Sequence, residues 1–436
     1  MAAYNLHKSL LKKGINSLML VNNKISNDST VVRNKIWFLD WINALINNKV
    51  NFLLSYSLGI FLRMIYKYYF IFYKSFLLEK NFIRNNKYQF FYTFQPDIIH
   101  FHDNQLNNYD LKTIKKISIN SNVVFSLHDL WLFTGHCGVP LDCDKYKTWC
   151  GECPNLKLPP RIYSDNTRKS IIYKFNEINL SRINFLTHSR FVHDTILSLD
   201  RYKKNRFDFI NYAIDTSKFK SKSKAALRNQ MGISNDLFIL MTNAVSITEN
   251  PYKDFNTLYK AFQILAGEYK KKIMLLVVGD KISNFNNASK DENILFVDPF
   301  PQSEVLINYY SIADIYVHSS NIETWGLAIS EALACGLPVI ASAVGAVSEQ
   351  IRGLSYKGKK CSLNKYTVEE ANGFLFERKN YLMLYDMIKY SKENKKIIRK
   401  LSKNSNKFAQ KYLNIDKSVS AYLDYYECIL ESQASN

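Results

Sequence analysis

Short apolar runs alternate along the chain with stretches of helical periodicity. In the first half these runs cover residues 17–21, 97–102, 122–128 and 183–189. A second series covers residues 237–243, 272–280, 293–298, 313–320 and 337–343. Apolar strands separated by helices are the pattern of a parallel sheet covered by helices. The sequence therefore predicts an α/β protein with two Rossmann-like domains that face a cleft.

A polar, basic stretch from Phe219 to Arg228 separates the two series, and we place the linker there. The predicted domains are residues 1–218 and 219–402, and a C-terminal helix over 403–436 is expected to cross back to the first domain. In open α/β sheets ligands bind beyond the carboxyl ends of the strands, so two facing domains would form one deep site.

The chain begins with an amphipathic helical pattern over residues 1–14, where a doubly wound domain usually has a strand and a glycine turn. The N-terminal domain is therefore expected to lack its first strand. The opening helix has no apolar core of the signal-peptide kind, and Arg63, Lys67 and Lys74 interrupt the most apolar region. We expect a cytoplasmic protein that does not span a membrane.

Residues 36–84 mix Trp, Tyr and Phe with Lys and Arg. One interpretation is a helical insertion whose apolar side covers its own domain. The other is an interfacial helix that rests on anionic lipid, at the inner face of the cytoplasmic membrane.

The net charge of +20 is compatible with nucleic acid, anionic lipid or phosphorylated substrates as partners. No RNA- or DNA-binding motif accompanies this charge, so we expect no nucleic-acid partner.

The stretch from Glu323 to Glu331 reads E-T-W-G-L-A-I-S-E, and Gly345 and Glu349 follow it. A loop enters a helix here, and backbone N–H groups at such a point can hold a diphosphate. The four positions concerned are Thr324, Trp325, Gly326 and Leu327. Eight residues correspond to just over two helical turns, so Glu323 and Glu331 can face the same cleft.

This block resembles the Glu-x7-Glu signature of the retaining glycosyltransferases of family four, which have the GT-B fold. Residues 211–219 resemble the hinge motif of that family, with Tyr212 in place of a glycine. Residues 125–129 resemble its strand that ends in His-Asp, and residues 372–375 resemble its late N-G-x-L strand.

The resemblance implies that Glu331 binds the ribose and that Glu323 contacts the donor sugar near the reacting carbon. It implies that Lys253 pairs with the diphosphate and that His128 lies across the cleft, near donor and acceptor. His102 and Asp129, at the ends of neighbouring strands, are candidates for the acceptor side, with packing at the strand ends as the alternative.

The predicted activity is transfer of a sugar from a nucleotide-diphosphate donor to a glycan, with retention, in surface polysaccharide synthesis. The acceptor is expected to be lipid-linked, and no cofactor is required for catalysis. The chain departs from the family in residues 243–248, which lack the usual arginine. The alternatives are a catalytically degenerate nucleotide- or glycan-binding relative and a sugar-nucleotide epimerase of the same fold.

A cysteine-rich loop over residues 136–154 contains Cys137, Cys143, Cys150 and Cys153. Four thiolates can form a tetrahedral zinc site, so a structural zinc ion is one interpretation. A disulfide or redox-active pair and free thiols are the others. The loop resembles an insertion found in a subset of these transferases that act in cell-surface polysaccharide synthesis.

Overall fold

The computed structural model describes residues 2–21, 24, 26–33, 94–102, 110–280, 293–299, 303–355 and 362–434. Two compact units divide the chain: one contains Met1–Ile15 and His100–Asn436, and the other contains Asn16–Ile99. The aromatic and basic segment 36–84 lies outside the described residues, so both interpretations of it stay predictions.

In the smaller unit, strands β1 (Met19–Val21) and β2 (Val31–Arg33) form a parallel pair. The chain of the larger unit starts with helix α1 (Ala2–Lys12), as the opening pattern predicts.

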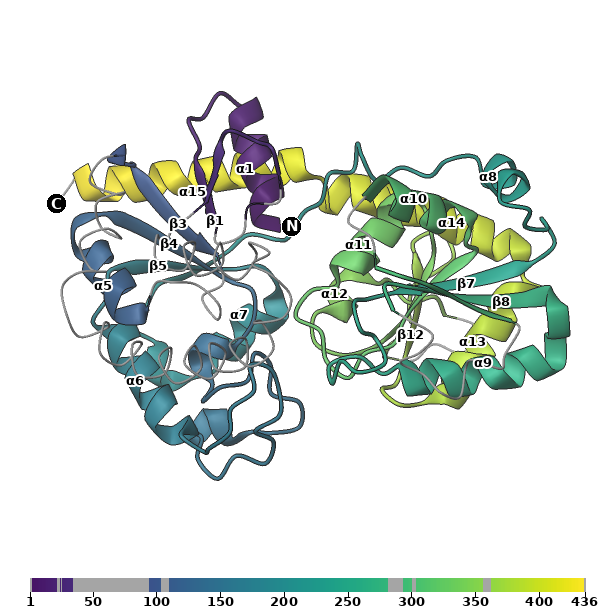
Figure 1. The fold of residues 1–436 in the computed structure, drawn as a ribbon, viewed down its shortest axis with the longest axis horizontal. Coiled ribbons are helices and arrows are strands. Elements are labelled where there is room, and N and C mark those ends of the chain that lie inside the picture. Colours follow the sequence, from purple (N-terminus) through teal and green to yellow (C-terminus); the bar gives the residue numbers. More distant parts are fainter. Residues whose placement is uncertain are drawn as a thin grey trace, which may run out of the picture. The chain divides into compact units, whose positions relative to one another are not determined.

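A four-stranded sheet organises the first half of the larger unit. Its order is β3 (Ile98–His102), β4 (Asn122–Leu127), β5 (Ile183–Thr187) and β6 (Phe207–Phe209). The pairs β4–β5 and β5–β6 are parallel. Helices α5 (Leu111–Asn120), α6 (Thr167–Asn179) and α7 (Arg190–Leu197) connect these strands (Figure 1).

Polar side chains fix where two of these helices begin. Asp110 accepts a hydrogen bond from the N–H of Thr113 at 2.6 Å, at the start of α5. Ser189 accepts one from the N–H of Val192 at 3.2 Å, at the start of α7. Each contact satisfies a backbone donor that the first helical turn leaves unpaired.

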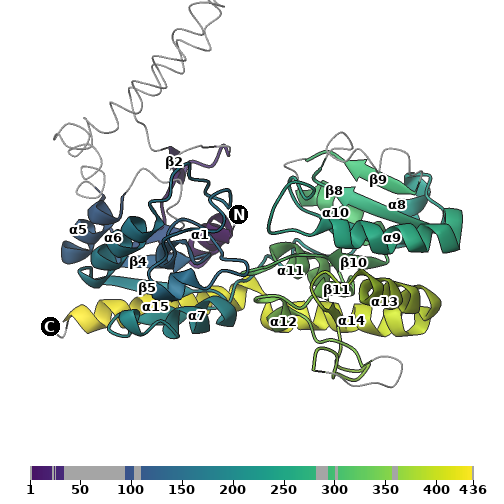
Figure 2. The same ribbon diagram turned by 90° about the horizontal axis from the view of Figure 1, so that it is seen from below.

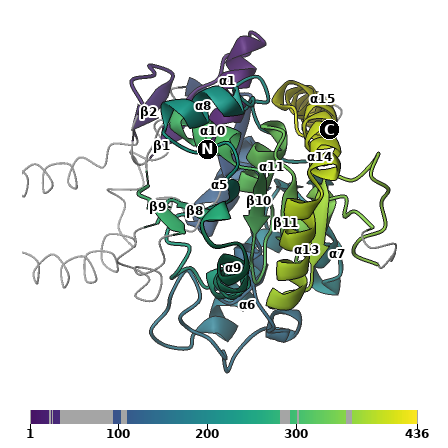
Figure 3. The ribbon, with the colours of Figure 1, turned by 90° about the vertical axis from the view of Figure 1, so that its right-hand side faces the viewer.

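The second half contains a six-stranded parallel sheet. Its order is β12 (Gly373–Phe376), β11 (Val339–Ser342), β10 (Ile315–His318), β7 (Phe238–Asn243), β8 (Ile273–Val278) and β9 (Ile294–Val297). Figure 3 labels β9, β8, β10 and β11 of this sheet, in which β7 lies between β8 and β10. The chain winds outward from β7 in one direction and then returns beside it at β10. The strand order therefore reverses between β7 and β10, which is where doubly wound sheets bind ligands.

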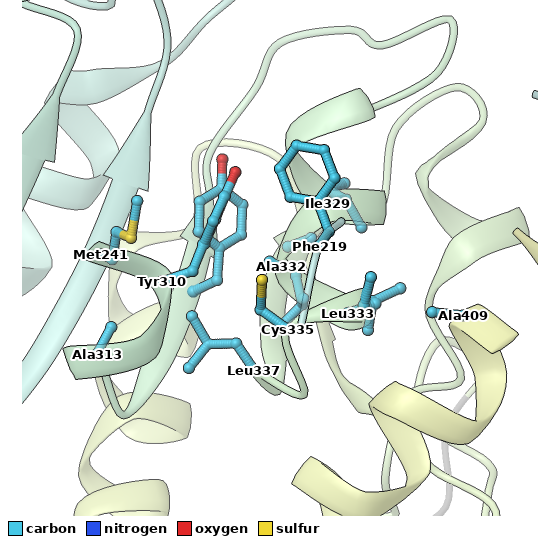
Figure 4. Packing of buried hydrophobic residues seen from close by; sticks show 14 of the residues in the cluster. Phe219, Met241, Tyr310, Ala313, Ile329, Ala332, Leu333, Cys335, Leu337 and Ala409 are labelled. Atoms are coloured by element: carbon cyan, nitrogen blue, oxygen red, sulfur yellow. The ribbon is translucent and has the colours of Figure 1, made fainter. Parts of the chain in front are cut away.

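Side chains of β7 alternate between two cores. Ile239 and Met241 pack in a cluster with α10 (Ser303–Ile312) and α11 (Leu327–Ala334), which Figure 4 shows from close by. Phe238 and Leu240 pack on the other face. The helices that cover that face are α9 (Phe255–Tyr269) and α13 (Tyr381–Glu393). The remaining short helices are α8 (Lys224–Gln230) and α12 (Val347–Gln350).

Two long helices end the described chain, α14 (Lys395–Tyr412) and α15 (Ile415–Ala434). Helix α14 lies beside α11 and α13 (Figure 2). Helix α15 contacts the first half, since the Tyr426 hydroxyl lies 2.6 Å from Nδ1 of His100.

The chain between these two helices pairs with the connection at Ile214. The N–H of Ile214 donates to the carbonyl of Leu413 at 2.9 Å, and the N–H of Ile415 donates to the carbonyl of Ile214 at 3.0 Å. The two passages between the halves therefore run side by side.

The predicted fold class is confirmed, because both halves are α/β with parallel strands. Each of the nine predicted apolar runs contains a strand, and β12 lies at the predicted late strand. The predicted linker contains most of helix α8 and ends at the buried Arg228. That guanidinium donates to Asp314 at 2.8 Å and to the carbonyl of Ile312 at 2.9 Å. Among the described helices, none is long and apolar enough to cross a membrane.

Candidate active site

The candidate donor site lies at the carboxyl ends of β7 and β10, where the strand order of the second sheet reverses. Asn243 ends β7 and His318 ends β10. Glu323 follows β10 in the loop that leads into α11, and Lys253 lies before α9. Lys253 and His318 both contact the carboxylate of Glu323.

Glu323 accepts two hydrogen bonds on its Oε2 atom. One comes from Nζ of Lys253 at 2.5 Å, and the other involves Nε2 of His318 at 3.0 Å. Because a carboxylate only accepts, Nε2 of His318 carries the proton of that ring. Burial opposes ionisation of Glu323, but Lys253 and His318 outweigh it and hold its pKa below the usual range. The pair places an ammonium and a carboxylate side by side in a partly buried site.

Glu331 lies in α11 with only 5% of its surface exposed. The hydroxyl of Tyr310 donates to its Oε2 atom at 3.0 Å and also lies 3.0 Å from Oδ1 of Asn243. Burial raises the pKa of Glu331 to about 7, against the opposing effects of Tyr310 and Lys218. Figure 4 shows Tyr310 in the core beside Met241 and Leu337.

The two glutamates act on a common neighbour. Burial raises the pKa of Tyr316, and the charges of Glu331 and Glu323 raise it further. The two glutamates therefore lie near the same tyrosine, and their roles at the donor site stay predictions.

The loop at the start of α11 is held by Gln350. Its Oε1 atom accepts from the N–H of Gly326, and its Nε2 atom donates to the carbonyl of Gly326, both at 3.0 Å. The N–H of Leu327 donates to the carbonyl of Trp325 at 3.1 Å. Two of the four N–H groups predicted to hold a diphosphate are therefore engaged within the protein. Those of Thr324 and Trp325 remain the candidates.

Gly345 fixes the position of Glu323. Its φ is +52°, and a Cβ atom there would lie 2.1 Å from the carbonyl oxygen of Glu323. The next residue, Ala346, donates its N–H to that same carbonyl at 2.9 Å. Only glycine allows this close approach without strain.

The turn after β7, which lacks the arginine of the family, is organised by Asp280. The Oδ2 atom of Asp280 accepts from the N–H of Thr248 at 3.0 Å and from its hydroxyl at 2.9 Å. A carboxylate thus stabilises this turn from within the protein.

A row of histidines lies at the carboxyl ends of three strands of the first sheet. The rings of His102 and His128 stack at 5.4 Å, and those of His128 and His188 stack at 5.4 Å. Nδ1 of His102 lies 3.2 Å from Nε2 of His128. Burial is the main cause that lowers the pKa values, to about 4 for His128 and about 3 for His188. These rings are therefore neutral near pH 7.

Tyr212 contacts both the row of histidines and the loop that leads into α11. Its hydroxyl hydrogen-bonds Nδ1 of His128, and its ring lies 6.1 Å from that of Trp325. His102, His128 and Tyr212 also line a small pocket with Ala2 and Leu6 of α1. The structure thus brings the two predicted histidines together.

Asp129 has a structural contact. Its Oδ1 atom accepts from the N–H of Trp131 at 2.7 Å, which holds the turn after β4. The acceptor-side role of Asp129 stays a prediction.

The four cysteines of the loop line one small pocket together with His136. Burial, against the opposing effect of Thr134 and with smaller contributions from the three other thiols, raises the pKa of Cys137 to about 11. These four cysteines are free thiols in the structure, and the zinc, disulfide and free-thiol interpretations of the loop stay predictions. Within the described ranges, no three His, Cys, Asp or Glu side chains hold metal-binding geometry as they stand.

Several residues of the site were not predicted, among them His188, His318, Tyr310 and Gln350. A signal for two of them was present, since His188 and His318 end apolar runs in the same way as His102 and His128. Nothing in the local sequence marks Tyr310 or Gln350, because their partners Glu331 and Gly326 lie 21 and 24 residues away.

Two α/β halves with parallel sheets, and a partly buried charged site at the switch point of the second, define a protein of GT-B fold. The overall likeness to solved structures agrees with this class. Sucrose-phosphate synthase from Thermosynechococcus elongatus matches with a TM-score of 0.65 at 16% identity, covering 99% of this chain and 93% of that one. The Anabaena protein HepE in complex with UDP and glucose matches with a TM-score of 0.55 at 16% identity, covering 77% and 78%.

Residues 224–408 match the family model of the glycosyl transferases group 1. The chain is also 26% identical over 273 residues to the putative colanic acid biosynthesis glycosyl transferase WcaC of Escherichia coli. That match covers 59% of this chain and 62% of the relative, so it spans less than two thirds of the relative's length. The predicted resemblance to GT-B glycosyltransferases is confirmed, while membership of the cysteine-rich subset stays a prediction.

Proposed function

We propose that this protein is a retaining glycosyltransferase that moves a sugar from a nucleotide-diphosphate donor to a glycan in surface polysaccharide synthesis. The observation that carries the proposal is the buried contact between Lys253 and Glu323 at the switch point. The family match of residues 224–408 covers both residues and supports the proposal.

The donor half of the site suits a nucleoside diphosphate. Tyr310 engages Oε2 of Glu331, and a ribose hydroxyl could donate to the other oxygen, Oε1. The neighbour HepE was solved with UDP, with UDP and glucose and with UDP-glucose, which supports a nucleotide-sugar donor. The particular nucleotide and sugar depend on the shape of the pocket.

Charge development on the leaving group explains the role of Lys253. As the bond from the sugar to the diphosphate breaks, negative charge grows on the phosphate oxygens. An ammonium already positioned in a buried site stabilises that charge without reorganisation. For this role Lys253 would exchange part of its contact with Glu323 for the diphosphate, and Glu323 would turn to the sugar.

Retention follows from attack on the same face that the diphosphate leaves. In this mechanism the acceptor hydroxyl transfers its proton to the departing phosphate, so no covalent enzyme intermediate is formed. The enzyme contributes orientation and charge stabilisation. His128, neutral near pH 7, is assigned to the acceptor side of the reacting carbon, where a neutral imidazole can hydrogen-bond a hydroxyl.

The acceptor and the location of the protein belong to the same proposal. The relative WcaC is named for colanic acid biosynthesis, which supports a surface polysaccharide as the product. The aromatic and basic composition of residues 36–84 supports a lipid-linked acceptor, with the protein peripheral at the inner face of the cytoplasmic membrane.

The test is incubation of the purified protein with a panel of nucleotide sugars, followed by separation of the products. Slow release of the nucleotide supports a transferase. A changed sugar on an intact nucleotide would indicate an epimerase, and binding without turnover would indicate a degenerate relative. Either of these results overturns the proposal.

The variant Lys253→Ala tests the assigned chemistry. Loss of one positioned charge should lower the rate of nucleotide release by about 10²-fold. The matched control is Lys271→Ala, which removes an exposed lysine from the same half of the chain. Equal rates for both variants would refute the role of Lys253.

A further inference from the structure

The loop between β4 and α6 gathers four thiols around one point. Cys137, Cys143, Cys150 and Cys153 come from a span of 17 residues, and all four line the same small pocket. The proposed transfer reaction does not use them, and the spacing of the four along the chain does not by itself require that they meet.

The backbone that carries two of these thiols is strained. Four consecutive residues, 149–152, have φ values of 79°, 54°, 99° and 46°, and only one of them is a glycine. Non-glycine residues in this region cost about 1–3 kcal/mol each, and they persist where the surroundings over-determine the conformation. The turn places the N–H of Gly135 within 3.2 Å of Sγ of Cys150.

His136 is oriented toward the same pocket. Its Nδ1 atom lies 3.1 Å from the carbonyl oxygen of Pro160, and because a carbonyl only accepts, Nδ1 carries the proton. The unprotonated Nε2 atom then faces Sγ of Cys153 at 3.4 Å. This is the arrangement of a histidine that accepts a hydrogen bond from a thiol.

A buried lysine lies behind the loop. Lys174 of α6 is 3% exposed, and its Nζ atom donates to the carbonyls of Trp131 at 2.7 Å and of Thr134 at 3.1 Å. These contacts tie the turn before Cys137 to α6.

The geometry points to a structural zinc ion bound by the thiolates of Cys137, Cys143, Cys150 and Cys153. Four sulfur ligands in a tetrahedron are the usual closed set for zinc, and no substrate position is left open. On binding, four thiols lose four protons and four Zn–S bonds form, so no oxidant or reductant is involved. The side chains do not hold metal-binding geometry as they stand, so the sulfur atoms must turn inward by rotation about their Cα–Cβ bonds.

The zinc-bound loop has a defined consequence for the rest of the chain. Asp142, next to Cys143, accepts from Nη2 of Arg378 at 2.7 Å. The carbonyl of Pro159 accepts from the hydroxyl of Tyr252, the neighbour of Lys253, at 3.1 Å. Both partners belong to the second half, so an ordered loop braces the segment that carries Lys253. This consequence rests on the proposed function, whereas the metal site itself does not.

The experiment measures metal in the purified full-length chain by elemental analysis, after dialysis against metal-free buffer. We expect about one zinc ion per chain. The double variant Cys150→Ser/Cys153→Ser should lose it, whereas Cys428→Ser should keep it, because Cys428 is an exposed thiol in α15. Zinc below about a tenth of an equivalent in the unaltered chain, iron in its place, or full retention in the double variant would each overturn the proposal.

A second measurement covers the case in which the double variant fails to fold. Exchange of the metal in the unaltered protein for Co²⁺ should produce the strong absorption of cobalt–thiolate bonds. A thiol reagent should find four additional reactive cysteines after a chelator is added. Absence of the absorption, or reactivity that the chelator does not change, overturns the site. Neither readout depends on transferase activity, so failure of the proposed function would leave the result intact.

Discussion

The substitution Glu331→Gln is expected to stabilise the protein at alkaline pH while it removes donor binding. Burial raises the pKa of Glu331 from 4.5 to about 7. The folded state therefore favours the protonated carboxyl more than the unfolded state does. Below pH 4.5 both states hold the proton and the penalty is absent. Above about pH 7 both states are ionised and the penalty is fully present.

The magnitude follows from the shift. The difference between about 7 and 4.5 is roughly 2.5 pKa units, which at about 1.4 kcal/mol per unit corresponds to about 3 kcal/mol. A glutamine has no charge to bury and still offers an oxygen to the hydroxyl of Tyr310. The variant should therefore gain up to about 3 kcal/mol at pH 8 and about nothing at pH 4.5, with the gain growing between these values.

The assay is urea denaturation of the two proteins at several pH values from 4.5 to 8, followed by circular dichroism. Binding of a nucleoside diphosphate by calorimetry provides the second readout. The matched control is Glu249→Gln, an exposed glutamate in the same half, which should change neither. A constant stability difference across this pH range, or a variant that is less stable at pH 8, would refute the reasoning. Intact nucleotide binding by Glu331→Gln would refute the ribose role.

Three further predictions concern the same site. Gly345→Ala should abolish nucleotide release, because its Cβ would lie 2.1 Å from the carbonyl oxygen of Glu323. The control Gly232→Ala should keep activity, because Gly232 has φ +68° but open space around it. Equal losses for the two variants would show that backbone strain alone is responsible. Burial lowers the pKa values of His100 and His188 to about 3 and of His128 to about 4, so these rings should stay neutral above pH 5 in an NMR titration. The stability of the folded state should therefore fall as the pH drops below 6.5. A titration midpoint above pH 6 for any of the three rings would contradict this. Tyr212→Phe should keep the ring contact with Trp325 but lose the hydrogen bond to His128. We therefore expect a raised KM for the acceptor with donor binding unchanged. A change in donor binding instead would place Tyr212 on the donor side.

Apolar periodicity predicted most of the fold, because each strand of five or six residues leaves a continuous run in the sequence. The strands β2 and β6 were missed, because each contains only three residues and lies in no longer apolar run; β1 is as short but lies in the apolar run 17–21. The helix α8 was placed in a linker because its composition is polar. The burial of Arg228 depends on Asp314, 86 residues away, and no local pattern reports such a partner.

For the candidate site, the sequence predicted several of the residues but not their contacts. Motif spacing led to Glu323, Glu331 and Lys253, yet the contact between Lys253 and Glu323 joins positions 70 residues apart. The raised pKa of Glu331 results from enclosure in the core around Tyr310, which is a property of packing. Gly345 could be recognised as part of the block, but the reason for a glycine there is the carbonyl oxygen of Glu323, which only the fold brings close.

The paired backbone at Ile214, Leu413 and Ile415 limits how the two halves can move. A single connection would allow one half to rotate in any direction, whereas two hydrogen-bonded segments favour rotation about the line along which they pair. Rotation of the halves about this line keeps these hydrogen bonds, whereas twisting or sliding would break them. The contacts of Asp142 with Arg378 and of Pro159 with Tyr252 also join the halves and would resist such a rotation. A crosslink between the two segments should leave this rotation intact.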